Sequence, residues 1–152
     1  AATMELDNGY DTIITKTGAT GEALESLTTV ADNVFSDMPT TMDDVGVAVG
    51  EVNTRFGATG TELENLSKEF IKFANINGTD LNTAIDSVDS IMTKFGVDAS
   101  QTKNVLGLMT KAGQDTGISM ETLETALTTN GASLKEMGLD LTSSVNLLAQ
   151  ME

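Results

Sequence analysis

The sequence predicts an all-α fold, an array or bundle of helical hairpins with about seven or eight helices and no sheet. The first reason is a repeat. Shifted by 39 residues, the sequence Gly-Ala-Thr-Gly at 18–21 falls on the same four residues at 57–60. A second corner repeats with the same shift, placing Pro39, Gly78 and Gly117 in one column. The third reason is that apolar residues recur at helical steps of three and four. These observations predict units of two helices and two short corners.

The first helix is expected near residues 4–16, where Leu6, Tyr10, Ile13 and Ile14 supply apolar positions among several carboxylates. It falls outside the 39-residue repeat, so we interpret residues 1–17 as the end of a longer upstream helix. Residues 18–152 then form a helical-hairpin repeat domain. Because the chain stops at Glu152 inside a helical pattern, we expect this domain to be truncated at its C-terminal end.

The repeat domain is expected to consist of helices that each carry one apolar stripe. Their expected ranges are 21–37, 41–55, 60–75, 80–94, 99–113, 119–130 and 141–151. The stripe of the helix at 41–55 is Met42, Val45, Val49, Val52 and Phe56, at steps of 3, 4, 3 and 4. The helices at 21–37, 60–75 and 80–94 repeat this spacing. A single hairpin cannot bury both of its stripes, so the hairpins are expected to stack on one another.

Each helix is expected to begin at a capping residue and to end at a glycine. Glycine reaches the left-handed backbone that closes a helix, whereas serine, threonine and aspartate satisfy the free amides at a helix start. Thr59 followed by Glu62 is typical of a capping box. The residues assigned to corners and caps are Gly18, Thr20, Gly57, Thr59, Gly78, Asp80, Gly96, Asp98, Gly117, Ser119, Gly138 and Asp140.

Two irregularities interrupt this pattern. The last glycine corner, at 137–140, comes three residues late, which an insertion within 130–133 would explain. Gly46, Gly50 and Gly107 lie inside expected helices, where glycine costs about 1 kcal/mol relative to alanine. We interpret all three as points where helices pack closely.

The composition excludes most kinds of catalysis. The chain has no cysteine and no histidine, so a thiol nucleophile, an imidazole base and the usual zinc ligands are missing. The glycine corners lack the lysine and the spacing of a phosphate loop, and the acidic segment 37–44 lacks the ligand spacing of a calcium loop. We therefore predict no catalytic, cofactor-binding or metal-binding residues. An enzyme that uses carboxylates would need a pocket lined by converging acids.

The charge distribution restricts the partners. The formal net charge is -15, and residues 1–50 hold nine acidic side chains against Lys16 alone. Such a surface repels phosphate, so we expect no direct binding of nucleic acid by this segment. No apolar run approaches the roughly 18 residues of a membrane span. A basic partner is the expected complement of this surface.

Arg55 is the residue that we single out as a candidate partner contact, together with Glu51. It is the only arginine of the chain, and Glu51 lies four residues before it on the same face of a helix. That spacing suits a structural ion pair at a helix end. Arginine is also over-represented at interface hot spots, so a partner contact stays open beside the structural role.

The segment 48–60, Ala-Val-Gly-Glu-Val-Asn-Thr-Arg-Phe-Gly-Ala-Thr-Gly, resembles the start of the core region in bacteriophage tail tape measure proteins of the TP901 type. Shorter phrases continue the resemblance over most of residues 18–152. They are Leu-Glu-Asn-Leu-Ser at 63–67, Lys-Phe-Ala at 72–74, Phe-Gly-Val at 95–97 and Leu-Lys-Glu-Met-Gly-Leu at 134–139, followed by Val145 and Leu148.

The resemblance implies a non-enzymatic structural and interaction module of a phage or prophage tail tape measure protein. Such proteins act in tail assembly, tail-length determination and genome delivery. The implied partners are tail tube proteins, tail assembly chaperones or other copies of the chain. The implied location is the tail lumen of the virion, and the host cytoplasm during assembly. The alternative is a helical binding module of a bacterial surface or secreted protein, which the neighbouring genes would distinguish.

Overall fold

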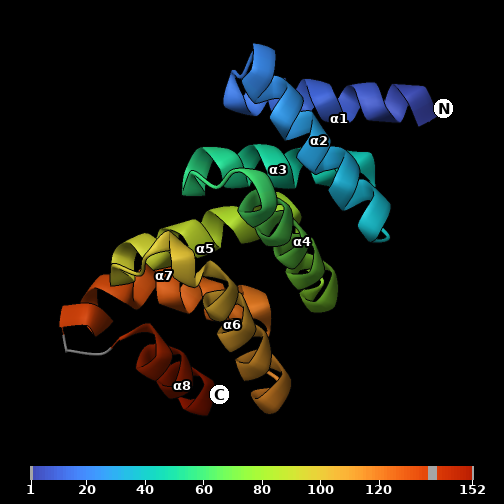
Figure 1. Ribbon diagram of the computed structural model, residues 1–152. Coiled ribbons are helices and arrows are strands. Elements are labelled where there is room, and N and C mark those ends of the chain that lie inside the picture. The colour runs from blue at the N-terminus through green and yellow to red at the C-terminus, as the bar shows by residue number, and fades with distance from the viewer. Residues whose placement is uncertain (1, 137–139, 152) are drawn as a thin grey trace. The chain divides into compact units, whose positions relative to one another are not determined.

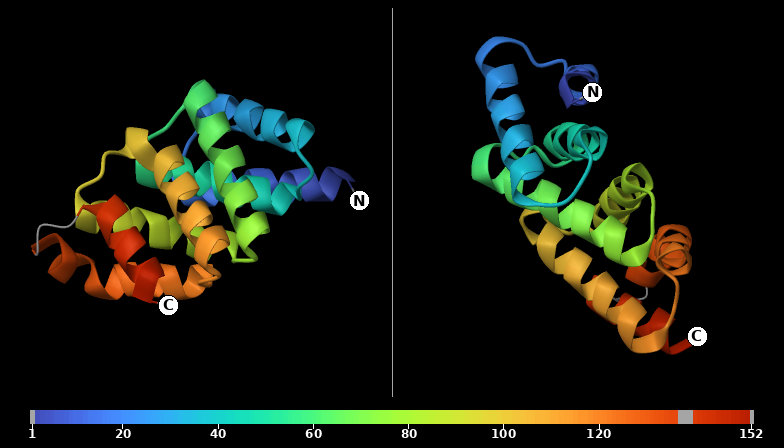
Figure 2. Two further views of the ribbon diagram at one scale, coloured as in Figure 1. Left: turned by 90° about the horizontal axis from the view of Figure 1, so that it is seen from below. Right: turned by 90° about the vertical axis from the view of Figure 1, so that its right-hand side faces the viewer.

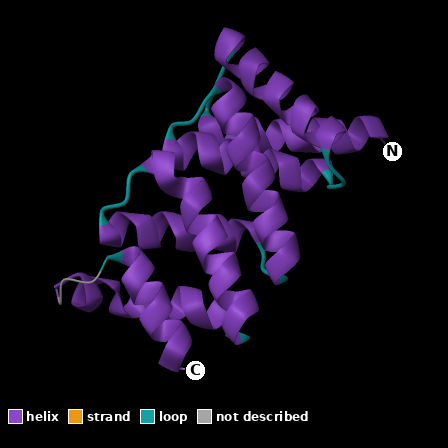
Figure 3. Cartoon of the chain, turned by 60° about the horizontal axis from the view of Figure 1, so that its bottom comes forward, coloured by secondary structure: helices purple, strands orange, loops and turns teal. Residues whose placement is uncertain are grey.

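The computed structural model describes residues 2–136 and 140–151. Over these ranges the chain forms eight α-helices, one short 3₁₀ helix and no strand, which confirms the all-α prediction (Figure 3). The elements are α1 (Ala2–Thr17), α2 (Gly21–Asp37), α3 (Met42–Phe56), α4 (Gly60–Asn77), α5 (Leu81–Phe95), η1 (Ala99–Gln101), α6 (Thr102–Thr116), α7 (Met120–Glu136) and α8 (Leu141–Met151).

The chain divides into two compact units. Unit 1 contains the residues up to Ala74 together with Asp80–Ile85, and unit 2 contains Asn75–Thr79 and the residues from Asp86 onward. The division falls within α4 and α5, so each of these helices contributes to both units.

Unit 1 is built around α3. Helix α1 packs along α3, and the right-hand view of Figure 2 shows both nearly end-on with α2 running across them. Helix α4 packs against α3 through the rings of Phe70 and Phe56, which stack with centroids 5.7 Å apart. The stripe predicted for α3 is fully buried over Met42, Val45, Val49 and Val52. Burial of this stripe stabilises the unit.

Unit 2 is built from α6, α7 and α8, which pack on one another, and from the C-terminal part of α5 (Figure 1). Its fully buried apolar side chains come from all four helices: Val88, Ile91, Met109, Leu123, Leu127 and Val145. The helical spacing that predicted the stripes therefore places buried apolar side chains on all four helices.

Polar side chains join alternate helices. The pairs are Asn33 with Glu64 and Lys68 with Asp37 between α2 and α4, Asn77 with Thr110 between α4 and α6, and Lys94 with the carbonyl of Thr128 between α5 and α7. The partners lie 31 to 34 residues apart in the chain. Contacts over about one hairpin are typical of stacked helical arrays. The period of 39 residues itself stays a prediction.

The glycine corners close the helices with left-handed backbone. At Gly57, with φ of 69°, the amide donates to the carbonyl of Asn53 at 3.0 Å. At Gly96, with φ of 67°, the next amide, that of Val97, donates to the carbonyl of Met92 at 2.8 Å. These are the two common ways in which a glycine satisfies the last carbonyls of a helix. A side chain at either position would strain the backbone.

One predicted helix end was wrong. Helix α7 does not stop near residue 130 but continues to Glu136. The reason is packing at Gly131, where a Cβ would lie 3.3 to 3.4 Å from atoms of Lys94 and Phe95, so this glycine admits α5 and does not end α7. The helix expected at 99–113 starts as the 3₁₀ helix η1, and α6 runs from Thr102 to Thr116.

Candidate functional site

The crossing of α1 on α3 positions the candidate contact residues. A Cβ on Gly46 would lie 2.7 Å from the carbonyl oxygen of Gly9, and a Cβ on Gly50 would lie 3.0 Å from Cβ of Lys16. Both glycines therefore allow the two helices to approach closely, as predicted. Among the described residues nothing lies within 4 Å of a Cβ built on Gly107, so the chain itself supplies no close packing at this glycine.

Lys16, Glu51 and Arg55 form a charge network at this crossing. Lys16 Nζ lies 2.7 Å from Glu51 Oε1, and Arg55 Nε lies 2.7 Å from Glu51 Oε2. The Glu51 side chain is only 17% exposed, against 31% for that of Arg55. One carboxylate therefore binds a cation of α1 and a cation of its own helix, and Arg55 has the structural role expected from its spacing.

The network determines the ionisation of Glu51. Its partial burial acts to raise the pKa of the carboxyl, but hydrogen bonds from Lys16 and Arg55 outweigh this and hold the pKa below the ordinary value of 4.5. Glu51 therefore stays charged at neutral pH, as an ion pair requires.

The corner that follows Arg55 is fixed by polar contacts. Thr54 Oγ1 donates to the carbonyl of Lys16 at 3.0 Å, which ties the end of α3 to α1. Asn53 Nδ2 donates to the carbonyl of Ala58 at 3.0 Å, across the turn at Gly57. The candidate contact therefore lies on a constrained corner.

The predicted cap residues lie at the starts of their helices. They differ in whether the side chain accepts an amide hydrogen of the first turn. Side chains accept an amide hydrogen at Asp80 from Thr83, at Asp98 from Ser100, at Ser119 from Thr122 and at Asp140 from Ser143. Thr20 occupies the N-cap of α2 but makes no side-chain capping bond. The carbonyl of Thr59 accepts from the amide of Leu63.

The glycines of these corners explain why the starts of α2 and α4 differ from the other helix starts. Gly21 and Gly60, the first residues of α2 and α4, have φ of 59° and 57°, so their backbone turns differently from an ordinary first turn. Gly18, Gly78 and Gly117 also have left-handed backbone. Gly138 lies outside the described residues.

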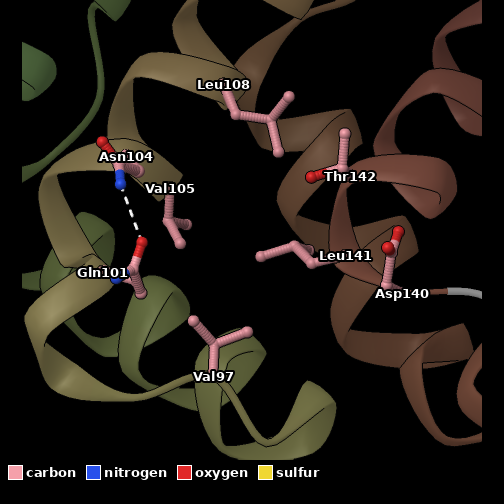
Figure 4. Close-up of a pocket in the computed structure, with 8 residues that line it drawn as sticks. All are labelled: Val97, Gln101, Asn104, Val105, Leu108, Asp140, Leu141 and Thr142. Atoms are coloured by element: carbon pink, nitrogen blue, oxygen red, sulfur yellow. Dashed lines mark hydrogen bonds between the residues drawn. The ribbon is translucent and has the colours of Figure 1, made fainter.

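A recess of about 240 Å³ lies between α6 and α8 in unit 2. In Figure 4 the side chains of Val97, Val105, Leu108 and Leu141 surround it, with Gln101, Asn104, Asp140 and Thr142 at its edge. Its carboxylate, Asp140, caps α8 by accepting the amide of Ser143 at 2.8 Å. Among the described residues that line the recess, no acids converge as carboxylate catalysis requires.

A family model described as phage-related minor tail protein matches residues 28–152. The chain belongs to this phage minor tail protein family. The match includes the Glu51–Arg55 pair, the corner at Gly57 and the recess, and it begins within α2. A search of curated proteins and a search of solved structures each gave no match.

Membership of the phage minor tail protein family supports a structural role in a phage tail and a place in the virion. Proteins of this family are generally structural and not enzymatic. Within the described ranges, no group of three or more acidic side chains is arranged to hold a metal ion. None of the described helices is long and apolar enough to cross a membrane.

Sequence reasoning missed one buried carboxyl group of this minor tail protein. Glu124 on α7 is 5% exposed, and its Oε1 has no hydrogen-bond partner among the described residues. Burial raises its pKa to about 7, a hydrogen bond with Ser87 opposes this rise, and nearby Glu121 adds to it. The sequence does indicate this burial, because Glu124 lies between Leu123 and Leu127, which belong to the buried stripe of α7.

Proposed function

We propose that this chain is a non-enzymatic structural and interaction module of a tail tape measure protein. The observation that carries the proposal is the match to the minor tail family over residues 28–152. The segment 48–60, which resembles the start of the tape measure core region, lies inside that match and forms the end of α3 and the corner after it. In this role the module takes part in tail assembly, tail-length determination and genome delivery.

The module acts in the tail lumen and, during assembly, in the host cytoplasm. Its partners are tail tube proteins, tail assembly chaperones or other copies of the chain. A tube is assembled around a protein of this kind, so its surface has to suit protein partners and to repel DNA. A net charge of -15 meets both requirements.

Several carboxylates of α1 and α2 are exposed, whereas two lysines of unit 1 lie in ion pairs. Lys16 lies in the ion pair with Glu51, and Lys68 binds both Asp37 and Glu64. These two cations are 24% and 20% exposed, whereas Glu22, Glu25 and several other carboxylates of α1 and α2 are exposed. A partner with a basic surface is the chemical complement.

The Arg55–Glu51 pair is the proposed first point of contact. It lies at the end of α3 beside the constrained corner at Gly57, and Arg55 is partly exposed. Arginine at such a position can contribute hydrogen bonds and stacking to a partner while its internal ion pair holds it in place.

Co-sedimentation with purified tail tube subunits tests the proposal. We expect the chain to sediment with the tube at low salt and to be released as the salt concentration rises, because exposed charges are screened. Binding that is absent under all conditions would remove the proposed role, and binding that is indifferent to salt would remove its electrostatic basis.

A pair of variants tests the contact residue. Arg55→Ala should weaken tube binding, whereas Lys72→Ala, which removes another exposed cation of unit 1, should leave it unchanged. Circular dichroism of both variants identifies any loss of helix that would mimic a binding defect. Equal binding by both variants and the native chain would assign Arg55 to the fold alone.

A further inference from the structure

Gly107 is the one described glycine that the fold itself does not explain. Glycines with left-handed backbone form the corners, and the other glycines inside helices lie against a neighbouring element. If a Cβ were added to each of these helical glycines, its nearest neighbouring atom would lie at 2.6 Å for Gly9, 2.7 Å for Gly46, 3.0 Å for Gly50, 3.4 Å for Gly113 and 3.3 Å for Gly131. At Gly107, in the middle of α6, nothing lies within 4 Å.

An interior helical glycine is unfavourable by about 1 kcal/mol relative to alanine, unless close packing offsets the loss. At Gly46 and Gly50 the approach of α1 supplies that offset. Gly107 is exposed, and no described segment of the same chain approaches it. The pattern of the other helical glycines therefore points to an approach at Gly107 by a second molecule.

The face of α6 around Gly107 is basic. Lys103 and Lys111 lie four residues before and after Gly107, so all three share one face of the helix. Lys111 is 75% exposed and pairs with Asp115 of the same helix. Of the helices that the structure describes, α6 is the one with more cations than carboxylates. An acidic helix with small residues at its centre is the complement of such a face.

Helix α2 has that chemistry. It carries four carboxylates and no cation. Glu25 and Asp32 are exposed, and the small side chains Ser26 and Thr29 lie exposed between them. At 1.5 Å per residue, Glu25 and Asp32 are about 10.5 Å apart along α2, and Lys103 and Lys111 are about 12 Å apart along α6. The two charge pairs therefore have matching spacing.

We propose that the face of α6 formed by Lys103, Gly107 and Lys111 docks helix α2 of a second copy of this chain. Gly107 and the small residues Ser26 and Thr29 let the two helices approach closely, and the lysines meet Glu25 and Asp32. The two faces belong to different helices, so the contact is heterologous and each copy can bind two others.

This inference names one of the partners in the proposed function and rests on it for its biological setting. Its test uses the purified chain alone. A monomeric chain would overturn the docking surface but would not affect the co-sedimentation with tube subunits that tests the tail role.

Analytical ultracentrifugation over a concentration series provides the first measurement. We expect association at low salt that reverses at high salt. Gly107→Gln should weaken it at least about tenfold, which corresponds to 1.4 kcal/mol, without lowering the melting temperature. Lys103→Glu/Lys111→Glu should abolish association, and Lys72→Glu, the control at an exposed lysine outside α6, should not. A native chain that stays monomeric up to its solubility limit overturns the proposal.

Charge exchange tests the pairing of the two helices. Glu25→Lys/Asp32→Lys should also abolish association, and Tyr10→Phe is the control for losing the hydrogen bond from Tyr10 to Asp32. Mixing this double variant with Lys103→Glu/Lys111→Glu should restore it, because each altered face then meets its opposite. A mixture that stays monomeric overturns the pairing.

The absence of cysteine from the chain allows a specific cross-link. Gly107→Cys mixed with Thr29→Cys should form a disulfide-linked heterodimer under mild oxidation, and neither variant mixed with Lys72→Cys should do so at a comparable rate. If the mixtures that contain Lys72→Cys cross-link as fast as the mixture of Gly107→Cys and Thr29→Cys, a second copy does not dock at Gly107. The same conclusion follows if the lysines of α6 bind a tail protein while the chain stays monomeric.

Discussion

Lys16 of α1 and Glu51 of α3 form a 2.7 Å ion pair at the point where Gly50 lets the two helices approach closely. Arg55 binds the other oxygen of the same carboxylate. Close packing and an ion pair therefore occur at one place, and the segment 48–60 forms the corner beside it.

Removing the charge of Glu51 should destabilise unit 1. In Glu51→Gln the cations of Lys16 and Arg55 lose their shared carboxylate in a site that is only 17% exposed, so we expect a loss of about 1 to 2 kcal/mol of unfolding free energy. Urea denaturation at pH 7 measures it. Asp115→Asn is the control, because it removes an ion pair whose members are 75% and 59% exposed. That variant should change stability by less than about 0.5 kcal/mol.

The pH dependence of this contribution has a defined sign. The folded pKa of Glu51 lies below the ordinary 4.5, so the folded state binds fewer protons than the unfolded state in this range. The stabilisation is present above pH 4.5 and is lost as the pH falls through the folded value. Glu51→Gln should therefore differ most from the native chain at neutral pH and least in acid. A constant difference across the range would contradict the assignment.

Glu124 should act in the opposite direction. Its pKa is raised from 4.5 to about 7, so the folded state binds its proton more tightly. The contribution of Glu124 to stability is largest below pH 4.5 and declines as the pH rises through about 7. Glu124→Gln should remove this decline and be more stable than the native chain at pH 8 by about 1 to 3 kcal/mol. Glu121→Gln, at an exposed position on the same helix, should keep most of the decline.

Alanine should have opposite effects at two helical glycines. At Gly46 the new Cβ would lie 2.7 Å from the backbone oxygen of Gly9, so we expect a loss of about 2 kcal/mol or more as α1 moves away from α3. At Gly107 the space is open, and the better helix propensity of alanine should add about 1 kcal/mol. Thermal unfolding of the two variants at low protein concentration measures both effects. If alanine changed stability equally at Gly46 and at Gly107, the close packing of α1 on α3 at Gly46 would be contradicted.

Two threonines at helix starts provide a matched test of capping. Thr41 accepts the amide of Asp44 at 3.1 Å, whereas Thr20 makes no side-chain capping bond. Thr41→Ala should cost about 1 kcal/mol, and Thr20→Ala should cost only a few tenths. Hydrogen exchange at the first amides of α3 and α2 should show the same contrast.

The helical fold was predictable because its signals are local. The stripe of α3 and the stop at Gly57 depend on residues within a few turns of one another, and spacing alone reveals them. The extension of α7 was not predictable in this way, because it depends on the contact of Gly131 with Lys94 and Phe95, which lie on a different helix. Propensity favours a stop at a glycine unless such a contact is known.

The candidate site was predictable only in part. The spacing of Glu51 and Arg55 indicated their ion pair, but nothing local indicates that Lys16 approaches the same carboxylate. The missing cap at Thr20 follows from the left-handed backbone of Gly21, which sequence does not distinguish from an ordinary helix start. The recess between α6 and α8 depends on how two helices far apart in the chain pack, so no local pattern predicts it.

The polar bonds between alternate helices, such as Lys68 to Asp37 and Asn77 to Thr110, join residues 31 and 33 positions apart. A chain held together by such short-range links has a mechanical property that a single tightly interwoven core lacks. Pulled from its ends, it should yield one hairpin at a time, each step lengthening the chain at modest force.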